Sequence, residues 1–310
     1  MIDKKNKIKL ALIIPTKNRP KEITRLLLSI RDQSVKSVQI IIVNGGSICL
    51  KQVLQDFTDL NINYLTSNLS LTLQRNLGIK FLLPTITHVG FLDDDIFLKK
   101  WTLEKMLSFW LGVPSDIGGV GFNITDGILR GPINFLKWPF FTGNKQIGRI
   151  LPSGYNTPYC PAKKNCYVDW LFGGATVWRR EVLDEFKFDE WYKGYAFLED
   201  VDFSYAVSKK YKLIVLAEAR VRHLSAQDLR VGRYVFGRHQ IINRYYFVKK
   251  NPELSVLCFL WASIGLLLEN ILKGIVRLKL AFFYRSLGNI AGLSKIISGK
   301  IKKLISKNKS

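Results

Sequence analysis

The first hundred residues alternate between short apolar runs and helical patterns, and this alternation leaves few folds open. Residues 8–15 (IKLALIIP) and 38–43 (VQIIIV) are apolar runs of strand length, as expected for buried strands. Between them, Pro20 begins a segment with apolar residues three and four positions apart, which predicts a helix. Strands that alternate with helices favour a mainly parallel sheet with helices on both faces.

The same alternation continues and places polar residues after strands. We predict further elements as follows: helices near 51–59, 71–82, 181 onward and 197–211, and strands near 63–65, 88–92, 168–171, 175–179 and 213–216. Residues 131–167 are irregular and rich in Pro, Gly and aromatic residues, as binding loops often are. Parallel sheets bind ligands at the carboxyl ends of their strands. Asn18, Asn44 and the run Asp93-Asp94-Asp95 are all expected at that edge.

Composition excludes several classes of protein and points to an anionic partner. The chain has 310 residues, of which 47% are hydrophobic and 23% charged, which excludes a disordered or low-complexity chain. Its net charge of +23 suits a polyanionic partner. Four cysteines are too few for a disulfide scaffold and suit a reducing compartment. The polar N-terminus does not read as a signal peptide.

Most of the positive charge lies in the C-terminal part of the chain. Residues 230–310 contain sixteen Lys and Arg against two acids, which gives +14 of the +23. Residues 256–268 are apolar, but a span extended to 276 would bury Glu269, Asn270 and Lys273 in lipid. Residues 290–305 form an amphipathic, basic helical pattern of the kind that lies in a membrane interface. We therefore predict a catalytic domain at 1–228 and a helical, membrane-associating region at 229–310. Packing of residues 256–268 onto the catalytic domain is the alternative.

The triplet Asp93-Asp94-Asp95 is the most specific chemical feature. It directly follows an apolar strand, and three adjacent carboxylates repel one another unless a cation neutralises them. Mg²⁺ and Mn²⁺ take oxygen ligands and commonly bridge carboxylates to phosphates. Because side chains alternate along an extended strand, Asp93 and Asp95 are expected to face the same side. A solvated acidic turn is the alternative interpretation.

Glu199 and Asp200 form a second acidic site at a predicted helix start. A carboxylate there is held ionised by the helix dipole and could act as a general base, or it could simply cap the helix. Gly173-Gly174 could let the backbone approach a ligand, or form a turn. His223 could bind a metal or a phosphate, although a lone histidine is more often structural.

Six motifs, in this order, resemble those of family 2 glycosyltransferases with the GT-A fold. They are IIPTKNRP (13–20), IIIVNGGS (40–47), LQRNLGI (73–79), FLDDDI (91–96), WLFGGATVWRREV (170–182) and FLEDVDFSYAV (197–207). The resemblance covers about residues 8–225. It implies inverting transfer of a sugar from a nucleoside diphosphate sugar, assisted by Mg²⁺ or Mn²⁺.

The resemblance also implies a role for each matching residue. Asp200 is expected to be the catalytic base, and the metal ligands are expected to be Asp93, Asp95 and His223. The donor site is expected to comprise Pro15, Thr16, Asn18, Arg19, Asn44, Arg75, Asp93 and Asp94, with Arg75 near the nucleobase. The acceptor is expected beside Trp170, Gly173, Gly174 and Glu199. Asn44 departs from the family pattern, which has an Asp there, and this leaves the identity of the base open.

Two other functions compete with sugar transfer. A metal-dependent nucleotidyltransferase would also use paired carboxylates, but the sequence lacks a glycine-rich phosphate loop with a lysine. A basic membrane- or nucleic-acid-binding module fits the tail, but the acidic strand end opposes nucleic acid. We expect a glycan or lipid-linked acceptor, no nucleic acid, and a cytoplasmic location on the inner face of the membrane. The oligomeric state is left open.

Overall fold

The computed structural model describes residues 8–126, 137–194, 196–224 and 232–301. The chain divides into two compact units, which are described separately below. The first unit comprises residues 1–128 and 159–226, and the second comprises 129–158 and 227–310. The boundary near 227 lies beside the expected one at 228/229. Residues 129–158, however, group with the C-terminal unit rather than with the first.

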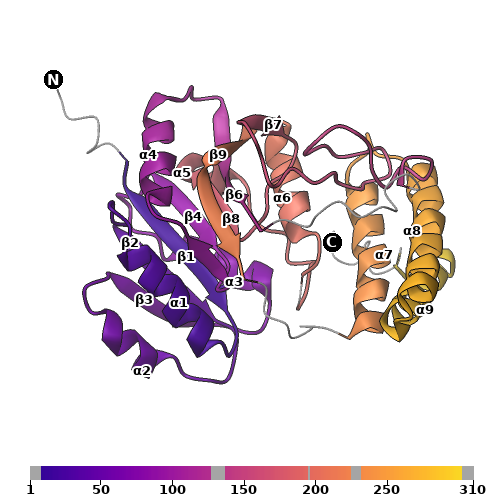
Figure 1. Cartoon of the computed structure of the whole chain (residues 1–310), viewed down its shortest axis with the longest axis horizontal. Helices are drawn as coiled ribbons and strands as arrows, with labels where there is room; N and C mark the ends of the chain where they lie inside the picture. The colour runs from indigo at the N-terminus through magenta and orange to yellow at the C-terminus, as the bar shows by residue number, and fades with distance from the viewer. Residues whose placement is uncertain (1–7, 127–136, 195, 225–231, 302–310) are drawn as a thin grey trace. The chain divides into compact units, whose positions relative to one another are not determined.

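The first half of the sheet follows the predicted alternation of strands and helices (Figure 1). Its elements are β1 (Leu10–Thr16), α1 (Pro20–Arg31), β2 (Gln39–Asn44), α2 (Lys51–Leu54), η2 (Gln55–Phe57), β3 (Ile62–Thr66), α3 (Leu71–Lys80) and β4 (His88–Leu92). β1 pairs in parallel with β2 and β4, and β2 pairs in parallel with β3. The carboxyl ends of these strands therefore lie at one edge.

The second half makes the sheet mixed rather than mainly parallel. Its elements are β5 (Ile96–Leu98), α4 (Thr102–Gly112), β6 (Ile117–Ile124), β7 (Cys166–Val168), β8 (Ala175–Arg179), α5 (Arg180–Glu185), α6 (Glu199–Ser208) and β9 (Lys212–His223). The strand order is β3-β2-β1-β4-β8-β6-β9-β5, with β7 also on β9. β8 is antiparallel to both β4 and β6, which joins the two halves. This is the mixed α/β architecture of the GT-A type.

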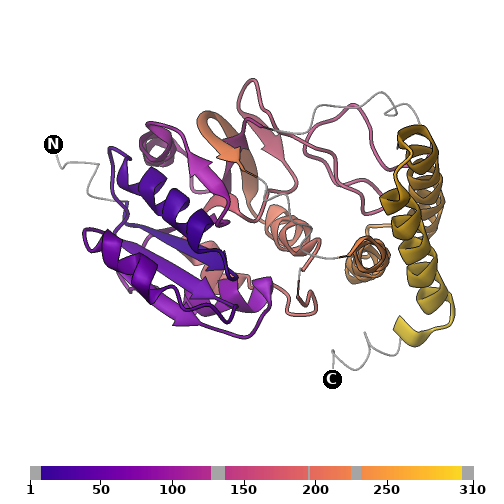
Figure 2. The same cartoon turned by 60° about the horizontal axis from the view of Figure 1, so that its bottom comes forward.

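Alternating side chains of β1 explain why helices cover both faces of the sheet (Figure 2). Leu10, Leu12 and Ile14 belong to one buried cluster with the apolar faces of α1 and α4. Ile13 points the other way and lies against Gly78 of α3. Helix α3 therefore lies on the opposite face from α1 and α4, next to the edge where the strands end.

In the described residues of the second unit, three helices pack together (Figure 1): α7 (Arg233–Lys250), α8 (Val256–Arg277) and α9 (Leu280–Ile297). Their core includes Ile241 and Tyr245 of α7, Phe259 and Leu266 of α8, and Ile296 of α9. Among the described residues, α8 is long and apolar enough to cross a membrane by length and composition. The part of the expected 290–305 pattern beyond Ile301 lies outside the described residues.

Candidate active site

Asp93 lies at the sheet edge where the site is expected, because it directly follows β4, the last parallel strand of the first half. Its backbone N–H donates to the carbonyl oxygen of Gly174 at 2.9 Å, which joins the end of β4 to the segment before β8. A Cβ on Gly174 would lie 2.0 Å from Asp93 Cγ. Only glycine at this position therefore leaves room for the carboxylate.

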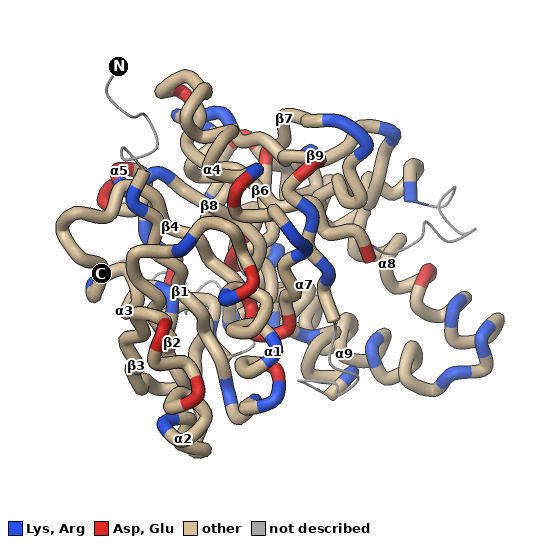
Figure 3. Tube along the Cα trace, turned by 60° about the vertical axis from the view of Figure 1, so that its left-hand side comes forward, with Lys and Arg blue, Asp and Glu red and all other residues tan. Residues whose placement is uncertain are grey.

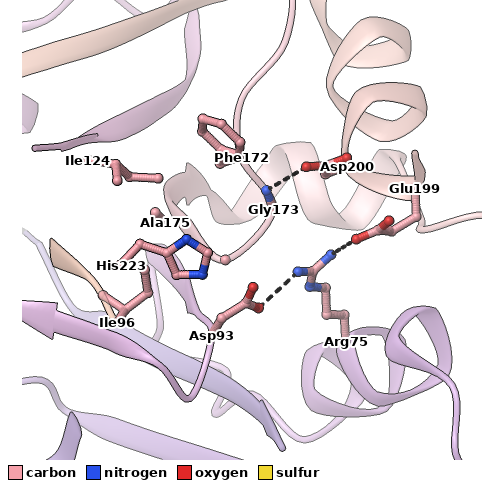
Figure 4. A pocket seen from close by; sticks show the side chains of 11 residues that line it. Arg75, Asp93, Ile96, Ile124, Phe172, Gly173, Ala175, Glu199, Asp200 and His223 are labelled. Carbon is pink, nitrogen blue, oxygen red and sulfur yellow. Dashed lines mark hydrogen bonds and ion pairs between the residues drawn. The ribbon is translucent and has the colours of Figure 1, made fainter. Parts of the chain in front are cut away.

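A pocket lies in front of Asp93 and encloses about 340 Å³, part of it open to solvent. Figure 4 shows the side chains that line it. They are Arg75, Asp93, Ile96, Ile124, Phe172, Ala175, Glu199, Asp200 and His223, together with the backbone of Gly173 and Gly174. The predicted metal-side residues Asp93 and His223 thus share a pocket with the predicted base, Asp200.

Arg75 lies between the two acidic motifs (Figure 4). Its guanidinium donates to Glu199 Oε1 at 2.9 Å and to Asp93 Oδ1 at 3.3 Å, and it is almost fully buried. A Cβ on Gly173 would lie 2.6 Å from the same guanidinium. Sequence reasoning placed Arg75 near the nucleobase. That placement stays a prediction, and the structure shows that the guanidinium lies between two carboxylates on the pocket side of the helix.

Asp94 and Asp95 have different surroundings from Asp93. Asp94 accepts hydrogen bonds from Thr16 Oγ1 at 2.8 Å and from Arg19 Nη1 at 2.9 Å. Arg19 also donates to Asp95 Oδ2 at 3.3 Å. Burial lowers the pKa of Arg19, but the two carboxylates outweigh it and raise that pKa overall. Arg19 and Thr16 are thus held by Asp94 on the donor side of the predicted site.

The triplet forms a turn, so strict alternation does not apply to it. The Ile96 N–H donates to the Asp93 carbonyl oxygen at 3.0 Å, and Asp94 and Asp95 occupy the turn between them. Asp95 is buried, and its Oδ1 lies 3.1 Å from His223 Nε2. Asp93 and His223 therefore line the pocket, whereas Asp95 is buried beside His223 and does not line it.

Asp200 lies at the start of α6, as predicted. One carboxylate oxygen accepts from the Gly173 N–H at 3.3 Å and the other from the Val201 N–H at 2.8 Å. Burial raises the pKa of Asp200, although Arg75 and these hydrogen bonds counteract it. Burial, with the neighbouring charge of Asp200, also raises the pKa of Glu199 to about 8. A base of raised pKa accepts a proton more readily than an ordinary carboxylate.

Trp170 is not among the residues that line this pocket, and its expected place beside the acceptor stays a prediction. It is buried between Tyr159 and Phe172, with ring centroids 4.9 Å away in each case. Phe172 is the member of this cluster that reaches the pocket. Trp170 therefore supports the pocket wall, because a large aromatic side chain gains more from burial than from partial exposure.

Pro15, Asn18 and Asn44 lie at the same sheet edge but outside the pocket. Pro15 remains within β1, paired with Val43. Asn44 donates to the Ile48 carbonyl oxygen at 2.8 Å and to Tyr64 Oη at 3.0 Å, and accepts from the Gly46 N–H at 2.9 Å. Asn18 Oδ1 accepts from the Ile48 N–H at 2.8 Å. Both asparagines thus fasten the loop after β2.

Two residues of α3, Gln74 and Asn76, flank Arg75 and hold neighbouring segments of the first unit in place. Gln74 Nε2 donates to the carbonyl oxygens of Thr16 and Val43 at 2.8 and 2.7 Å, which fixes the ends of β1 and β2. Asn76 donates to the Phe188 carbonyl oxygen at 2.9 Å and accepts from the Phe188 N–H at 3.1 Å. Three consecutive polar residues in the middle of the helix are the sequence signal for this arrangement.

The donor groups of the pocket suit a hard divalent cation. Carboxylate oxygens such as those of Asp93 and Asp95 are the ligand type that Mg²⁺ and Mn²⁺ prefer, and the imidazole of His223 is a common metal ligand in general. Asp95 and His223 are already adjacent, and Asp93 lines the same pocket as His223. Within the described parts of the chain, no three His, Cys, Asp or Glu side chains are already close enough together to form a metal site. The residue types fit a metal, and the substrate phosphates would complete its coordination.

Comparison with known proteins matches the chain to one family model and to solved structures with a similar fold. Residues 11–157 match the family model "Glycosyl transferase family 2". No curated protein matches the sequence. Mannosyltransferase PcManGT from Pyrobaculum calidifontis, solved with GDP-Man and Mn²⁺, is 13% identical with a TM-score of 0.57, and the match covers 93% of this chain and 86% of that one.

TarS from S. aureus is a second structural relative. Its fragment 1–349 is 16% identical with a TM-score of 0.52, covering 96% of this chain and 92% of that one. The same fragment has been solved with UDP-GlcNAc. A longer TarS structure is 17% identical with a TM-score of 0.53, over 76% of this chain, and the match spans 39% of that structure's length. At these identities the likeness establishes a shared fold.

Proposed function

We propose that this chain, a glycosyltransferase that belongs to glycosyl transferase family 2 through residues 11–157, moves a sugar from a nucleoside diphosphate sugar to an acceptor hydroxyl with inversion. The observation that supports this most is one pocket with Asp93 and His223 at one side and Asp200 at the other. Sugar transfer needs a group that holds the diphosphate and a group that removes a proton. The side with Asp93 and His223 holds the diphosphate, and the side with Asp200 removes the proton.

In the proposed step, Asp200 is the base. Its carboxylate takes the proton of the acceptor hydroxyl as that oxygen forms its bond to the anomeric carbon. The bond from that carbon to the diphosphate oxygen breaks, and the nucleoside diphosphate leaves with the electron pair. The Gly173 N–H orients Asp200, and Phe172 helps to exclude water from the pocket. Glu199, which is bound to Arg75, borders the acceptor.

The donor is proposed to lie along the ends of β1 and β4. Asp93, Asp95 and His223 would hold Mn²⁺ or Mg²⁺, which when bound neutralises the charge that grows on the leaving diphosphate. Arg19, kept ionised by Asp94 and Asp95, adds a positive charge on that side. Both amide hydrogens of Asn44 are used within the chain, whereas its Oδ1 accepts one hydrogen bond and could accept a second one from the base. PcManGT and TarS were solved with GDP-Man and UDP-GlcNAc, respectively.

A donor screen tests this proposal directly. Purified protein is incubated with radiolabelled UDP-, GDP- and dTDP-sugars, with Mn²⁺, with Mg²⁺ or with EDTA, and release of the sugar is measured. We expect release from one nucleotide class, loss of release in EDTA, and recovery when Mn²⁺ is added back. Full activity in EDTA would overturn the metal assignment, and pyrophosphate release from a nucleoside triphosphate would overturn sugar transfer.

Replacing Asp200 tests its role as the base. The Asp200→Asn side chain is nearly isosteric but cannot accept a proton at neutral pH. We expect transfer to fall by about 10²- to 10⁴-fold, the usual contribution of a general base, with donor affinity little changed. A collapse of donor affinity with turnover intact would instead make Asp200 a donor ligand.

The acceptor and the place of reaction are part of the same proposal. We propose a glycan or lipid-linked acceptor, with the enzyme peripheral on the cytoplasmic face of the membrane. Support comes from the charge of residues 230–310 and from the apolar composition of α8. An acceptor carried on a lipid would be concentrated at that surface.

A further inference from the structure

The solvent-facing side of α8 is apolar along nearly its whole length. Every exposed residue of this fully described helix is apolar up to Val276, and Arg277 ends it. Six of these residues form a single stripe at spacings of three and four, named here the α8 stripe: Leu257, Trp261, Ile264, Leu268, Leu272 and Ile275. A surface helix in water normally carries charged or polar residues on this side.

The opposite side of α8 is packed and contains polar residues. Phe259 and Leu266 join the core of the second unit. Asn270 Nδ2 donates to Asn289 Oδ1 of α9 at 3.0 Å, and Glu269 pairs with Lys273 at 2.6 Å. A lone spanning helix would have to leave this core and carry these charges into hydrocarbon, which is costly. The packing therefore favours a helix that lies along a surface.

The turn from α8 to α9 is the most exposed apolar part of the chain that the structure describes. Val276, Leu278 and Leu280 are 72%, 90% and 70% exposed. Arg277 and Lys279 alternate with them, and both are exposed as well. In Figure 3 the first part of α8 is uncharged, an acidic segment follows it, and basic residues lie towards its end and at this turn. Apolar side chains interleaved with cations match a layer of apolar tails beneath anionic headgroups.

The apolar surface continues onto α9. Leu280, Tyr284 and Leu287 lie at spacings of four and three on one face, and all three are exposed. Tyr284 and Trp261 are aromatic residues with a polar group, the type that lies at the headgroup level of membranes. The Trp261 indole N–H donates to the Pro139 carbonyl oxygen at 2.9 Å, so its polar atom is satisfied while part of its ring remains exposed.

We propose that the α8 stripe and the α8–α9 turn dock on an anionic lipid surface, with both helices in the interface and the turn inserted. This deepens the membrane association of the proposed function by naming the face and excluding a span. It rests on no step of sugar transfer, so the two proposals can fail separately. Charge complementarity favours lipid over a second copy of this chain, which would carry the same cations.

Two pairs of substitutions in the full-length protein test the docking face. Val276→Ser with Leu278→Asn alters the turn, with Asn chosen because Leu278 has φ of +48° and Asn tolerates that conformation. Ile264→Ser with Leu268→Ser alters the stripe. The matched control is Phe81→Ser with Leu83→Ser, two exposed apolar residues of the first unit. A charge variant, Arg277→Gln with Lys279→Gln, is matched by Lys163→Gln with Lys164→Gln, which are also exposed.

Binding is measured by flotation with phosphatidylcholine vesicles that contain 0% or about 30% phosphatidylglycerol. We expect the wild type and both controls to float with the anionic vesicles. We expect each apolar variant to lose at least about tenfold in bound fraction, and the charge variant to lose binding to anionic vesicles in particular. Donor hydrolysis without acceptor should be the same in all variants. Its absence in the wild type would count against sugar transfer and not against docking.

Four outcomes would overturn the proposal. Flotation of the apolar variants at the wild-type level would show that this face does not dock. Resistance of the bound wild type to alkaline carbonate would indicate a span. A dimer that both apolar variants convert to a monomer, with flotation unchanged, would make a second copy the occupant. A fall in melting temperature in the two apolar variants but not in their controls, again with flotation unchanged, would mean that the α8 stripe and the turn pack against other parts of the protein.

Discussion

The guanidinium of Arg75 holds two carboxylates that have different tasks in the proposed reaction. It binds Asp93 on the donor side and Glu199 on the acceptor side, and its charge opposes the rise in the pKa of Asp200. A single buried cation thus joins the two ends of the pocket. The sequence indicated that Arg75 belongs to the site, but a pattern of residues cannot show which of several carboxylates a long side chain reaches.

Removing this charge should shift the pH dependence of transfer. In Arg75→Gln the pKa of Asp200 rises further, because an opposing positive charge is lost. A base is active when ionised, so the acid limb of kcat/KM against pH should move to higher pH. Arg180→Gln, which removes an exposed partner of Asp184, is the control and should leave the limb in place. An unmoved or lowered limb in Arg75→Gln would contradict the assignment.

Gly174 gives a second prediction for a single residue. A methyl group in Gly174→Ala would lie 2.0 Å from Asp93 Cγ and must displace that carboxylate. Because a shift of about 1 Å in an active site can cost about 10²-fold in rate, we expect a loss of that size in kcat/KM. Gly112→Ala, where no atom lies within 4 Å of the new methyl, is the control. Wild-type kinetics for Gly174→Ala would show that the position of Asp93 is not critical.

Among the elements, α3 organises the site through three consecutive side chains. Gln74 binds the ends of β1 and β2. Arg75 binds one carboxylate of each acidic motif. Asn76 binds the backbone of Phe188, in the segment that leads towards α6. Consecutive residues point about 100° apart around a helix, so one helix can reach three parts of the unit. This arrangement explains why a helix beside the sheet edge tolerates so many buried polar groups.

Asn76→Ala tests this function of α3. The substitution leaves both backbone groups of Phe188 without their partner, and each buried unsatisfied group costs about 1–3 kcal/mol. We expect a loss of about 2–4 kcal/mol in the free energy of unfolding, measured with urea, together with weaker acceptor-dependent turnover. Asn61→Ala removes an exposed amide that donates to the Val38 carbonyl oxygen and should change stability by less than about 0.5 kcal/mol. Equal effects of the two would argue against α3 as an organising element.

The helices and strands that were predicted from the sequence are those with a strong local pattern of apolar and turn-forming residues. β1 and β2 begin and end within two residues of the expected 8–15 and 38–43, and α1 begins at Pro20 as expected, since each has a clear apolar period and a Pro or Gly boundary nearby. No prediction was made for β5, α4 or β6. β9 runs from Lys212 to His223, well beyond the predicted 213–216, because pairing with β6, β7 and β5 extends it. That extension brings His223 to Asp95, which local sequence could not indicate.

At the scale of the whole molecule, two buried groups give stability opposite dependences on pH. His88 is buried beside Trp110, and burial, with the charge of Arg179, lowers its pKa to about 4. Between pH 6.5 and 4 the unfolded chain therefore binds a proton that the folded chain does not, and stability falls as the pH falls. Glu199, with a pKa of about 8, retains its proton in the folded state where the unfolded chain has lost it. Stability therefore falls as the pH rises from about 4.5 to 8.

These opposite slopes predict how the free energy of unfolding depends on pH. The contributions of His88 and Glu199 oppose each other between about pH 4.5 and 6.5, and Glu199 dominates above that window. The pKa of Asp200 is raised as well, mainly by burial, so its contribution has the same sign as that of Glu199. Glu199→Gln should remove the decline between pH 6.5 and 8, and His88→Gln should remove part of the loss below pH 6.5. Urea titrations at five pH values measure both effects. A decline above pH 6.5 that persists unchanged in Glu199→Gln would show that this carboxyl is ionised in the folded protein and that Arg75 outweighs the cost of burial.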